Sequence, residues 1–144
     1  MGIEALSRGA ALVLFVERDP VALDVVRDNL SALGLEDRAT VVRADVLSWL
    51  ASRAGAQARF DLALCDPPYA FDAWGELLER LPASVAVLES GQPVDLGRRW
   101  EPSRSKRYGG TLVTVVRPAG GPPAGASAPA SAPEEKGPEE KGTA

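Results

Sequence analysis

The sequence feature that most restricts the fold is a tetrapeptide with two consecutive prolines, Asp66-Pro67-Pro68-Tyr69. It directly follows the apolar run at residues 62–65, which predicts a buried strand. Because proline has a fixed φ and no amide N–H, the strand must end there and the chain must turn stiffly out of the sheet. Ligands bind outside the carboxyl ends of strands in open α/β sheets, so Asp66 and Tyr69 are candidate functional residues. The simpler interpretation is a strand end followed by a Pro-Pro turn.

Apolar runs and helix signals alternate through residues 1–118. Strands that alternate with helices are typical of a parallel sheet with helices on both faces, so we expect an α/β fold. Helices are expected at residues 3–8, 20–33, 46–54 and 73–81. Strands are expected at residues 12–16, 40–42, 60–65, 84–89, 98–108 and 111–116, the last two as a hairpin around Gly109-Gly110.

Composition excludes several classes of site. The chain has 144 residues, which suits a single domain, and it contains one cysteine and no histidine. Ser-His and Cys-His catalysis, histidine zinc sites and intramolecular disulfides are therefore excluded, and no metal site is expected. Cys65 lies inside an apolar run and is predicted to be a core thiol. No apolar run approaches the roughly 20 residues that span a membrane, and no leader pattern opens the sequence, so we expect a cytoplasmic protein.

Residues 119–144 differ in character from the rest of the chain. They contain no aromatic and no branched apolar residue, and the segment at 133–137 is repeated at 138–142. Such a composition cannot bury enough apolar surface to offset the entropy lost on ordering, so a disordered tail is predicted. The folded domain is expected to cover residues 1–118.

Several segments, in this order and spacing, resemble one known family. They are Gly2-Ile3-Glu4-Ala5-Leu6-Ser7-Arg8-Gly9-Ala10, Phe15-Val16-Glu17-Arg18-Asp19, Asn29-Leu30, Ala44-Asp45-Val46, Asp66-Pro67-Pro68-Tyr69 and Tyr108-Gly109-Gly110-Thr111. The family is the RsmD-type family of bacterial methyltransferases, which methylate the exocyclic amine of a guanine in 16S ribosomal RNA. The resemblance implies that this ribosomal RNA, or the small ribosomal subunit, is the partner of a monomeric enzyme.

The resemblance also implies a fold and a cofactor. The fold is the Rossmann-like class I S-adenosylmethionine-dependent methyltransferase fold, here incomplete at the N-terminus and with a C-terminal β-hairpin. Glu17 is expected to accept hydrogen bonds from the ribose hydroxyls of S-adenosylmethionine. Asp45 would contact the adenine amine, Val46 would supply a backbone N–H and an apolar contact, and Asp66 would border the methyl group. Glu17 could instead be a solvated strand end, and Asp45 could be an ordinary helix cap.

For the tetrapeptide, the resemblance implies a catalytic role. Asp66 and the carbonyl of Pro67 would accept the two N–H bonds of the target amine, which frees its lone pair for attack on the sulfonium methyl. Pro68 completes the stiff turn, and Tyr69 would stack on a base flipped out of its helix. Enzymes that methylate adenine amines share this tetrapeptide, so an adenine-amine nucleic-acid methyltransferase is an alternative.

A basic segment near the predicted hairpin is a candidate RNA-binding surface. It combines cationic and aromatic side chains and contains Glu101 as its only acid. Its members are Arg98, Arg99, Trp100, Arg104, Lys106, Arg107 and Tyr108. An edge strand protected from aggregation by its charges would look the same in sequence, so this interpretation stays open.

The sequence departs from the family pattern at its beginning. Members of the family carry a further N-terminal stretch, which includes a first strand and a glycine-rich loop that approaches the cofactor. The strands at 12–16 and 61–65 would flank that first strand, so we expect them to lack a shared neighbour here. Weak cofactor binding and low stability are expected for the same reason. A non-catalytic remnant that still binds RNA is therefore the second alternative.

Overall fold

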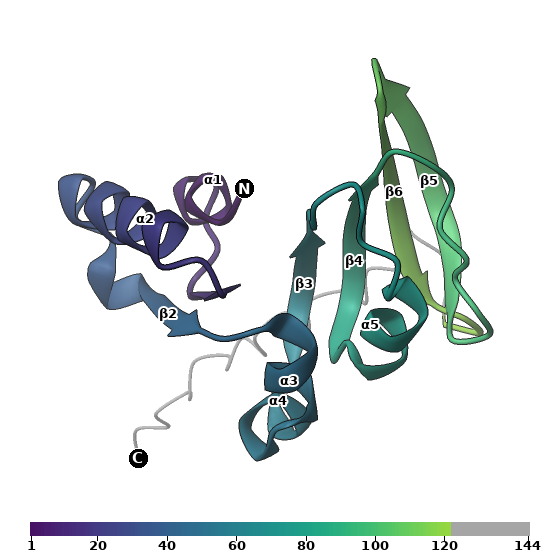
Figure 1. Ribbon diagram of the computed structural model, residues 1–144, viewed down its shortest axis with the longest axis horizontal. Helices are drawn as coiled ribbons and strands as arrows, with labels where there is room; N and C mark the ends of the chain where they lie inside the picture. The colour runs from purple at the N-terminus through teal and green to yellow at the C-terminus, as the bar shows by residue number, and fades with distance from the viewer. Residues whose placement is uncertain (122–144) are drawn as a thin grey trace, which may run out of the picture.

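The strands form two separate sheets in the computed structural model, which describes residues 1–121 (Figure 1). The helices are α1 (Gly2–Ser7), α2 (Pro20–Ala32), α3 (Val46–Ala51), α4 (Arg53–Gln57) and α5 (Trp74–Arg80), with a 3-10 turn, η1 (Glu36–Arg38). The strands are β1 (Val13–Glu17), β2 (Ala39–Arg43), β3 (Phe60–Cys65), β4 (Ala83–Ser90), β5 (Trp100–Tyr108) and β6 (Thr111–Pro118). Most of the predicted tail lies outside the described residues, so its disorder stays a prediction.

Strand pairing divides the molecule into two parts. β1 and β2 pair in parallel, and the second sheet has the order β3-β4-β6-β5. β3 and β4 are parallel, whereas β6 runs antiparallel to both of its neighbours, so the predicted hairpin of β5 and β6 is confirmed. Among the described residues, β1 and β3 share no neighbouring strand, as the resemblance led us to expect.

Local signals explain where the longer helices begin and end. The Asp19 carboxylate accepts a hydrogen bond of 2.8 Å from the amide of Val21, and Pro20 occupies the first helical position of α2. Gly34, at φ +64°, takes the left-handed conformation that follows the end of α2. Asp45 caps α3 in the same way, with Oδ1 3.0 Å from the amide of Ser48.

The helix predicted at 46–54 is wrong in its extent. It ends at Ala51, and a separate helix, α4, begins after Ser52, whose hydroxyl accepts a hydrogen bond from the amide of Gly55. Gly55, the residue directly after the predicted helix, lies inside α4 and packs against the backbone of Trp49 and Leu50. A Cβ at Gly55 would lie 2.2 Å from the carbonyl oxygen of Trp49, so only glycine fits.

The four-stranded sheet carries the connected hydrophobic core. The buried residues of this core come from α5, β4, β5 and β6, and they are Leu78, Leu81, Ala83, Ala86, Leu88, Trp100 and Val116. The indole N–H of Trp100 donates a 2.7 Å hydrogen bond to the carbonyl of Leu78, which attaches β5 to α5. Cys65 packs against this core, which confirms the predicted core thiol.

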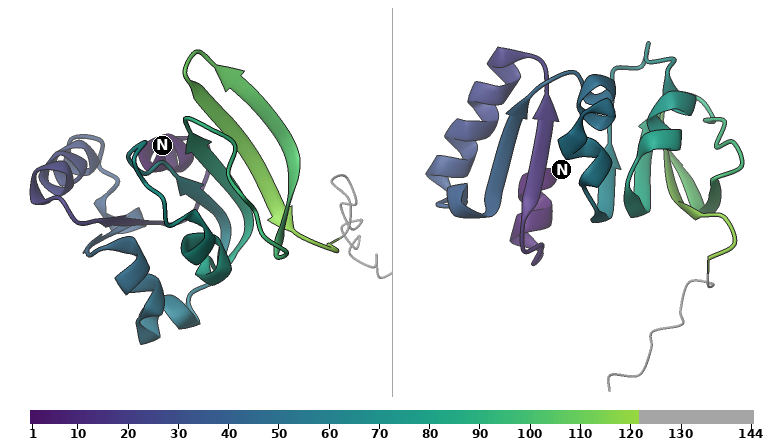
Figure 2. Two further views of the ribbon diagram at one scale, coloured as in Figure 1. Left: turned by 45° about the vertical axis from the view of Figure 1, so that its right-hand side comes forward. Right: turned by 90° about the horizontal axis from the view of Figure 1, so that it is seen from below.

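One helix lies between the two sheets. α3 contacts both β1 and α5, and Figure 2 shows it in the space between the β1–β2 pair and the larger sheet. The centroid of the Trp49 ring, on α3, lies 6.3 Å from the centroid of the Phe60 ring, on β3. In the part of the chain that the structure describes, no helix is long and apolar enough to cross a membrane.

Candidate functional site

The tetrapeptide turns out of the sheet where the sequence predicted. β3 ends at Cys65, Asp66 is exposed directly after it, and Pro67 is half-buried. The carbonyl of Pro68 accepts a 2.8 Å hydrogen bond from the amide of Phe71, which closes the turn. The strand cannot continue because neither proline has an N–H to donate to the ladder. The turn therefore presents the Asp66 carboxylate at the carboxyl end of β3. The prediction of a buried strand is wrong, because β3 lies at the edge of its sheet, each of its residues is half-buried or exposed, and Leu62 is 47% exposed.

The ring of Tyr69 is held from the hairpin. Its side chain is 71% exposed, yet its hydroxyl lies 2.7 Å from the hydroxyl of Thr111, the first residue of β6. The ring also passes close to Gly91: a Cβ built on Gly91 would lie 3.8 Å from Cδ1 of Tyr69, which is ordinary van der Waals contact. The sequence identified Tyr108-Gly109-Gly110-Thr111 only as a family signature. In the structure, the last residue of that signature orients the aromatic ring of the tetrapeptide.

A hollow of about 180 Å³ adjoins the tetrapeptide. Pro67, Pro68 and Tyr69 line one side, and Glu89 and the residues at 90–94 line another. The volume is roughly six times the 30 Å³ share of one water molecule in the liquid, so it suits a small planar group. Sequence reasoning missed Glu89 and the 90–94 segment, because their link to the tetrapeptide depends on the pairing of β3 with β4.

The residues at 90–94 are themselves fixed. The hydroxyl of Ser90 donates a 2.7 Å hydrogen bond to the carbonyl of Gln92. The rings of Phe71 and Trp74, which also line the hollow, meet edge to face with their centroids 5.4 Å apart and an interplanar angle of 86°. Such aromatic pairs favour this arrangement, so the walls of the hollow are pre-formed.

Glu17 ends β1 with its carboxylate anchored by backbone amides. Oε1 accepts hydrogen bonds of 2.7 Å from the amide of Arg18 and 2.8 Å from the amide of Asp19. These bonds fix the orientation of the carboxylate and use only one of its two oxygens. The interpretation of Glu17 as a merely solvated strand end is therefore incomplete.

Asp45 lies after the neighbouring strand and is brought close to Glu17. The amide of Ala44 donates a 3.0 Å hydrogen bond to the carbonyl of Glu17, which joins the ends of β1 and β2. The backbone hydrogen bond from Ser48 is the main cause that lowers the pKa of Asp45 below its usual value. Asp45 is thus a helix cap, as one interpretation predicted, and it stays charged at neutral pH. Val46 is the first residue of α3, directly beside it.

These two carboxylates come from neighbouring strand ends. Both follow the carboxyl ends of adjacent parallel strands, where ligands of this fold class bind. Oε1 of Glu17 and Oδ1 of Asp45 contact the backbone, and each carboxylate keeps a second oxygen that can accept from a ligand. Their role in cofactor binding stays a prediction.

Cys65, between the core and Asp66, is not a nucleophile. Desolvation by burial raises the pKa of its thiol from 9.0 to about 12, so the reactive thiolate is absent at neutral pH. Within residues 1–121 there is also no group of three or more His, Cys, Asp or Glu side chains that could hold a metal ion.

The basic segment divides into structural and exposed members. Trp100 is 3% exposed, so it belongs to the core and not to an RNA-binding surface. The Arg99 guanidinium donates to the carbonyls of Glu79 and Leu81 at the end of α5. Arg99 is therefore occupied in attaching β5 to α5.

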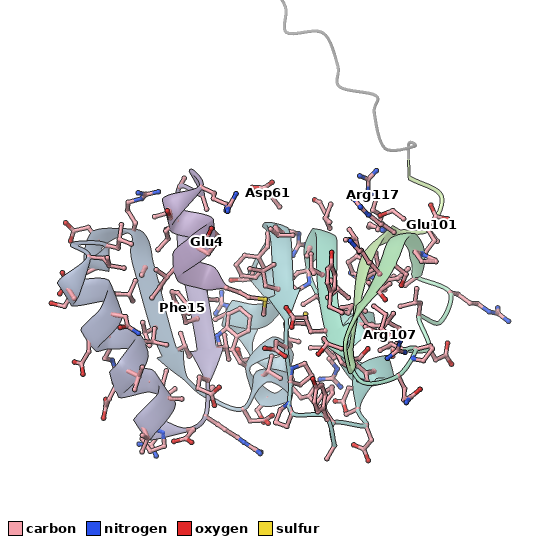
Figure 3. All side chains as sticks on the ribbon, turned by 90° about the horizontal axis from the view of Figure 1, so that it is seen from above. Glu4, Phe15, Asp61, Glu101, Arg107 and Arg117 are labelled. Carbon is pink, nitrogen blue, oxygen red and sulfur yellow. The ribbon has the colours of Figure 1, made fainter. Side chains whose placement is uncertain are left out.

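The exposed members lie mainly along β5. Arg104 and Lys106 are exposed. The Lys106 ammonium lies 4.8 Å from the centre of the Tyr108 ring, so Lys106 and Tyr108 share a face of the strand. Arg107 is turned toward the hollow, with Nη1 3.4 Å from the carbonyl of Gly91. Figure 3 shows Arg107 and Glu101 far apart along the hairpin. Arg98 precedes β5 and is exposed.

Comparison with protein families identifies the chain. A family model described as "Conserved hypothetical protein 95" matches residues 1–117. The chain belongs to this RsmD-like family. Its architecture is the class I S-adenosylmethionine-dependent methyltransferase fold, as the resemblance implied.

Individual relatives agree with this assignment. The chain is 42% identical over 69 residues to "Putative rRNA methyltransferase YlbH" of Bacillus subtilis, a match that covers 48% of this chain and 38% of that protein. It is 34% identical over 70 residues to "tRNA1(Val) (adenine(37)-N6)-methyltransferase" of Shewanella loihica, which covers 48% of this chain and 29% of that one. The chain thus spans less than two fifths of the length of either relative.

A solved structure extends the likeness over more of the fold. The "putative methylase HI0767" of Haemophilus influenzae superposes with a TM-score of 0.68 at 25% identity. The match covers 81% of this chain and 78% of that one, so it includes both sheets.

Proposed function

We propose that this chain is an S-adenosylmethionine-dependent RNA methyltransferase, and that its target is the N2 amine of a guanine in 16S ribosomal RNA. The observation that carries the proposal is the hollow beside Asp66-Pro67-Pro68-Tyr69, at the carboxyl end of β3. An acidic acceptor, a rigid turn and a held aromatic ring are the groups that positioning an aromatic amine requires. The relative named "Putative rRNA methyltransferase YlbH" supports the choice of ribosomal RNA, and the resemblance to the RsmD-type family supports the choice of guanine.

The cofactor would lie across the carboxyl ends of β1, β2 and β3. Proteins of this architecture hold S-adenosylmethionine or its product S-adenosylhomocysteine. Glu17 would bind the ribose hydroxyls, while Asp45 and Val46 would bind the adenine. When bound, the cofactor supplies a sulfonium methyl group, and its placement next to Asp66 would aim that methyl at the target amine.

Positioning is the main contribution of the protein to the reaction. The lone pair of the guanine amine is conjugated with its ring, and hydrogen bonds to Asp66 and to the carbonyl of Pro67 would pull the nitrogen toward tetrahedral geometry. A bound S-adenosylmethionine would supply its methyl group to this nitrogen and leave as S-adenosylhomocysteine, and Asp66 or water would accept the proton that the nitrogen loses. Holding both partners at contact distance contributes roughly 7–11 kcal/mol to such a reaction. This needs no histidine base, which agrees with the composition.

The target base would be bound in the hollow after it leaves its helix. Tyr69 provides a stacking surface, and each stacked base contributes about 1–3 kcal/mol in single-strand binding. The hydrogen bond to Thr111 holds the ring in place before the base arrives. A pre-oriented ring loses less side-chain entropy on binding.

The role of Asp66 is tested by Asp66→Ala. We expect a loss of methyl transfer of roughly 100- to 1,000-fold, the effect of removing one pre-organised electrostatic contact from an active site. The assay measures transfer of labelled methyl from S-adenosylmethionine to small ribosomal subunits, and calorimetry measures cofactor affinity, which should change little. Asp61→Ala is the matched control, because Asp61 is an exposed carboxylate on the same strand (Figure 3). Turnover by Asp66→Ala equal to that of Asp61→Ala would refute the role of Asp66.

The exposed face of β5 would contact the RNA backbone. Charge reversal with Arg104→Glu and Lys106→Glu should weaken RNA affinity and flatten its salt dependence, because fewer phosphate counterions are released. Cofactor affinity should stay the same. The control pair, Arg27→Glu and Arg53→Glu, makes the same change in net charge on α2 and α4. Equal loss of RNA affinity in both pairs would show a general charge effect and not a surface on the hairpin.

Methylation of an adenine amine is the competing activity, since the relative from Shewanella loihica is named as an adenine-N6 enzyme. Digestion of the methylated RNA to nucleosides and mass spectrometry separate the two. We expect N2-methylguanosine. N6-methyladenosine as the product would replace the proposal with the competing one, and no methylated nucleoside would favour a non-catalytic RNA-binding remnant.

A further inference from the structure

Glu89 is the only charged residue among the described residues that line the hollow. It lies near the carboxyl end of β4, where Ala86, Leu88 and Ser90 point into the core with 0%, 0% and 7% exposure. Because successive side chains alternate across a strand, Glu89 points to the opposite face, and it is half-buried there.

The register of the sheet places Glu89 beside Asp66. Cys65 is paired with Leu88 in the parallel ladder of β3 and β4, so Asp66 and Glu89 are the next residues on neighbouring strands. Neighbouring strands lie roughly 4.8 Å apart. Asp66 directly follows β3 and Glu89 lies near the end of β4, so carboxylate-bearing residues stand at adjacent backbone positions of the two strands.

Glu89 has no structural partner that would explain its position. None of the hydrogen bonds or ion pairs found between side chains of residues 1–121 uses its carboxylate. Two hairpin cations with defined contacts have other partners: Arg107 is directed to the carbonyls of Gly91 and Gly110, and Lys106 lies over the Tyr108 ring. The carboxylate of Glu89 is therefore available to accept a hydrogen bond from a ligand.

We infer that Glu89 selects guanine by accepting the N1–H of the base whose N2 amine is held at Asp66. This deepens the proposed function and rests on it, because the amine must be at Asp66 for its ring neighbour to reach Glu89. Asp66 and the Pro67 carbonyl then accept both hydrogens of N2, and Glu89 accepts the hydrogen on the adjacent ring nitrogen. Every donor on that edge of the guanine has an acceptor.

The chemistry of the four bases makes this contact selective. An ionised carboxylate only accepts hydrogen bonds. In guanine, the ring nitrogen N1 beside the amine carries a hydrogen. In adenine, the amine lies between N1 and N7, which are both acceptors, and in cytosine it lies beside the acceptor N3; uracil has no amine. Guanine alone satisfies Glu89, and adenine would place a lone pair against its charge.

Short RNA oligomers of uridine with one central purine test this contact by binding alone. The purines are guanine, adenine and 2-aminopurine, which keeps the N2 amine but has an acceptor at N1. Fluorescence anisotropy of end-labelled oligomers gives each Kd. We expect wild type to bind the guanine oligomer roughly 10- to 100-fold more tightly than the other two, the effect of one hydrogen bond to a charged acceptor.

Glu89→Gln should bring the three affinities within about three-fold, because the amide can donate to N1 as well as accept from it. Glu101→Gln is the matched control, at the far end of the hairpin, and should keep the preference (Figure 3). Glu89→Asp, which keeps the charge, should retain the preference for guanine and serves if Glu89→Gln does not fold.

Three results would overturn the inference. They are equal wild-type affinity for guanine and 2-aminopurine, an unchanged preference in Glu89→Gln, and no binding of any oligomer. Selective binding that depends on Glu89, without methyl transfer to any RNA, would refute the proposed activity but not the base-reading contact. The two proposals therefore fail in different measurements.

Discussion

The two sheets of the molecule are stabilised in different ways (Figure 2). In the four-stranded sheet, Ala86, Leu88 and Val116 are completely buried and belong to one connected core. In the β1–β2 pair, no strand residue is buried, and every residue of β1 is half-buried. The smaller sheet has buried partners only in the helices around it, such as Leu23 on α2, which is 0% exposed.

This difference separates the two halves of the candidate site. The tetrapeptide follows β3, which has no buried residue, whereas Glu89 lies on β4, which supplies several core residues. Glu17 and Asp45 belong to the pair of strands that has little core of its own. Two-stranded units are marginally stable at best by themselves. The proposed base site is therefore attached to the core through β4 and held by the Tyr69–Thr111 hydrogen bond, whereas the order of the proposed cofactor site depends on neighbouring helices and polar contacts.

The largest effect is expected from truncating one apolar side chain in each sheet. Leu88→Ala, in β4, should lower the free energy of unfolding by about 2–5 kcal/mol, because it leaves a cavity in a connected core. Val41→Ala, in the half-buried β2, should cost about 1 kcal/mol, the usual cost of a single substitution. Urea denaturation followed by circular dichroism measures both. Equal costs would mean that the two sheets are packed alike.

A smaller effect is expected from the polar attachment of the β1–β2 half. The Arg38 guanidinium donates to the carbonyls of Leu6, Ala10 and Ala11, at 3.2 Å for Leu6 and 3.3 Å for Ala11. Arg38→Met should remove about 1.5–3 kcal/mol of local stability, as is typical of hydrogen bonds from charged groups. Hydrogen exchange should quicken in α1 and not in β4.

Arg27→Met is the control for this change, because Arg27 forms only an exposed ion pair with Asp24 at 3.1 Å. Exposed pairs of this kind contribute little. If Arg38→Met quickened exchange equally in α1 and β4, the two sheets would unfold as one unit, which would contradict a separate stabilisation of the β1–β2 pair.

The smallest effect is expected at the hydrogen bond between Tyr69 and Thr111 in the base site. Tyr69→Phe and Thr111→Val each remove the bond between the two hydroxyls, which contributes about 0.5–1.5 kcal/mol. Affinity for the guanine oligomer should therefore fall roughly 2- to 10-fold in either variant. The double variant should be no weaker than either single one, because both remove the same contact.

Thr40→Val is the matched control, since Thr40 is an exposed hydroxyl residue of β2, outside the hairpin. Additive losses in the double variant, or an equal loss in Thr40→Val, would show that the hydrogen bond does not position the ring.

Local rules made much of the fold predictable. Asp19 and Pro20 define the start of α2, and Gly34 lies at its end, because capping and φ preferences act over a few residues. The Pro-Pro turn fixed the end of β3 for the same reason. The division of the predicted helix at Ser52 was missed, because the apolar spacing over residues 46–54 outweighed a local signal: Ser52 is extended and its hydroxyl caps α4.

The candidate site was predictable only in part. Asp66 and Tyr69 could be identified because they flank the prolines. Trp100 was assigned to the wrong environment, since tryptophan suits both an RNA-stacking surface and a core. Its place in the core depends on the hydrogen bond to the carbonyl of Leu78, which lies far away in the sequence. Thr111 and Glu89 carried no local signal, because each acts on the tetrapeptide from another strand.

The sequence by itself determined the order of the strands and helices, the stiff exit of β3 at Asp66 and the exclusion of histidine chemistry. These depend on backbone conformation and side-chain type, which are properties of short segments. The tertiary structure decided which segments meet. It joined Thr111 to Tyr69, set Glu89 beside Asp66 and divided the strands between two sheets, because hydrogen-bond register and burial act between residues far apart in the chain. The tetrapeptide is a local feature, and the base pocket around it exists only in the folded sheet.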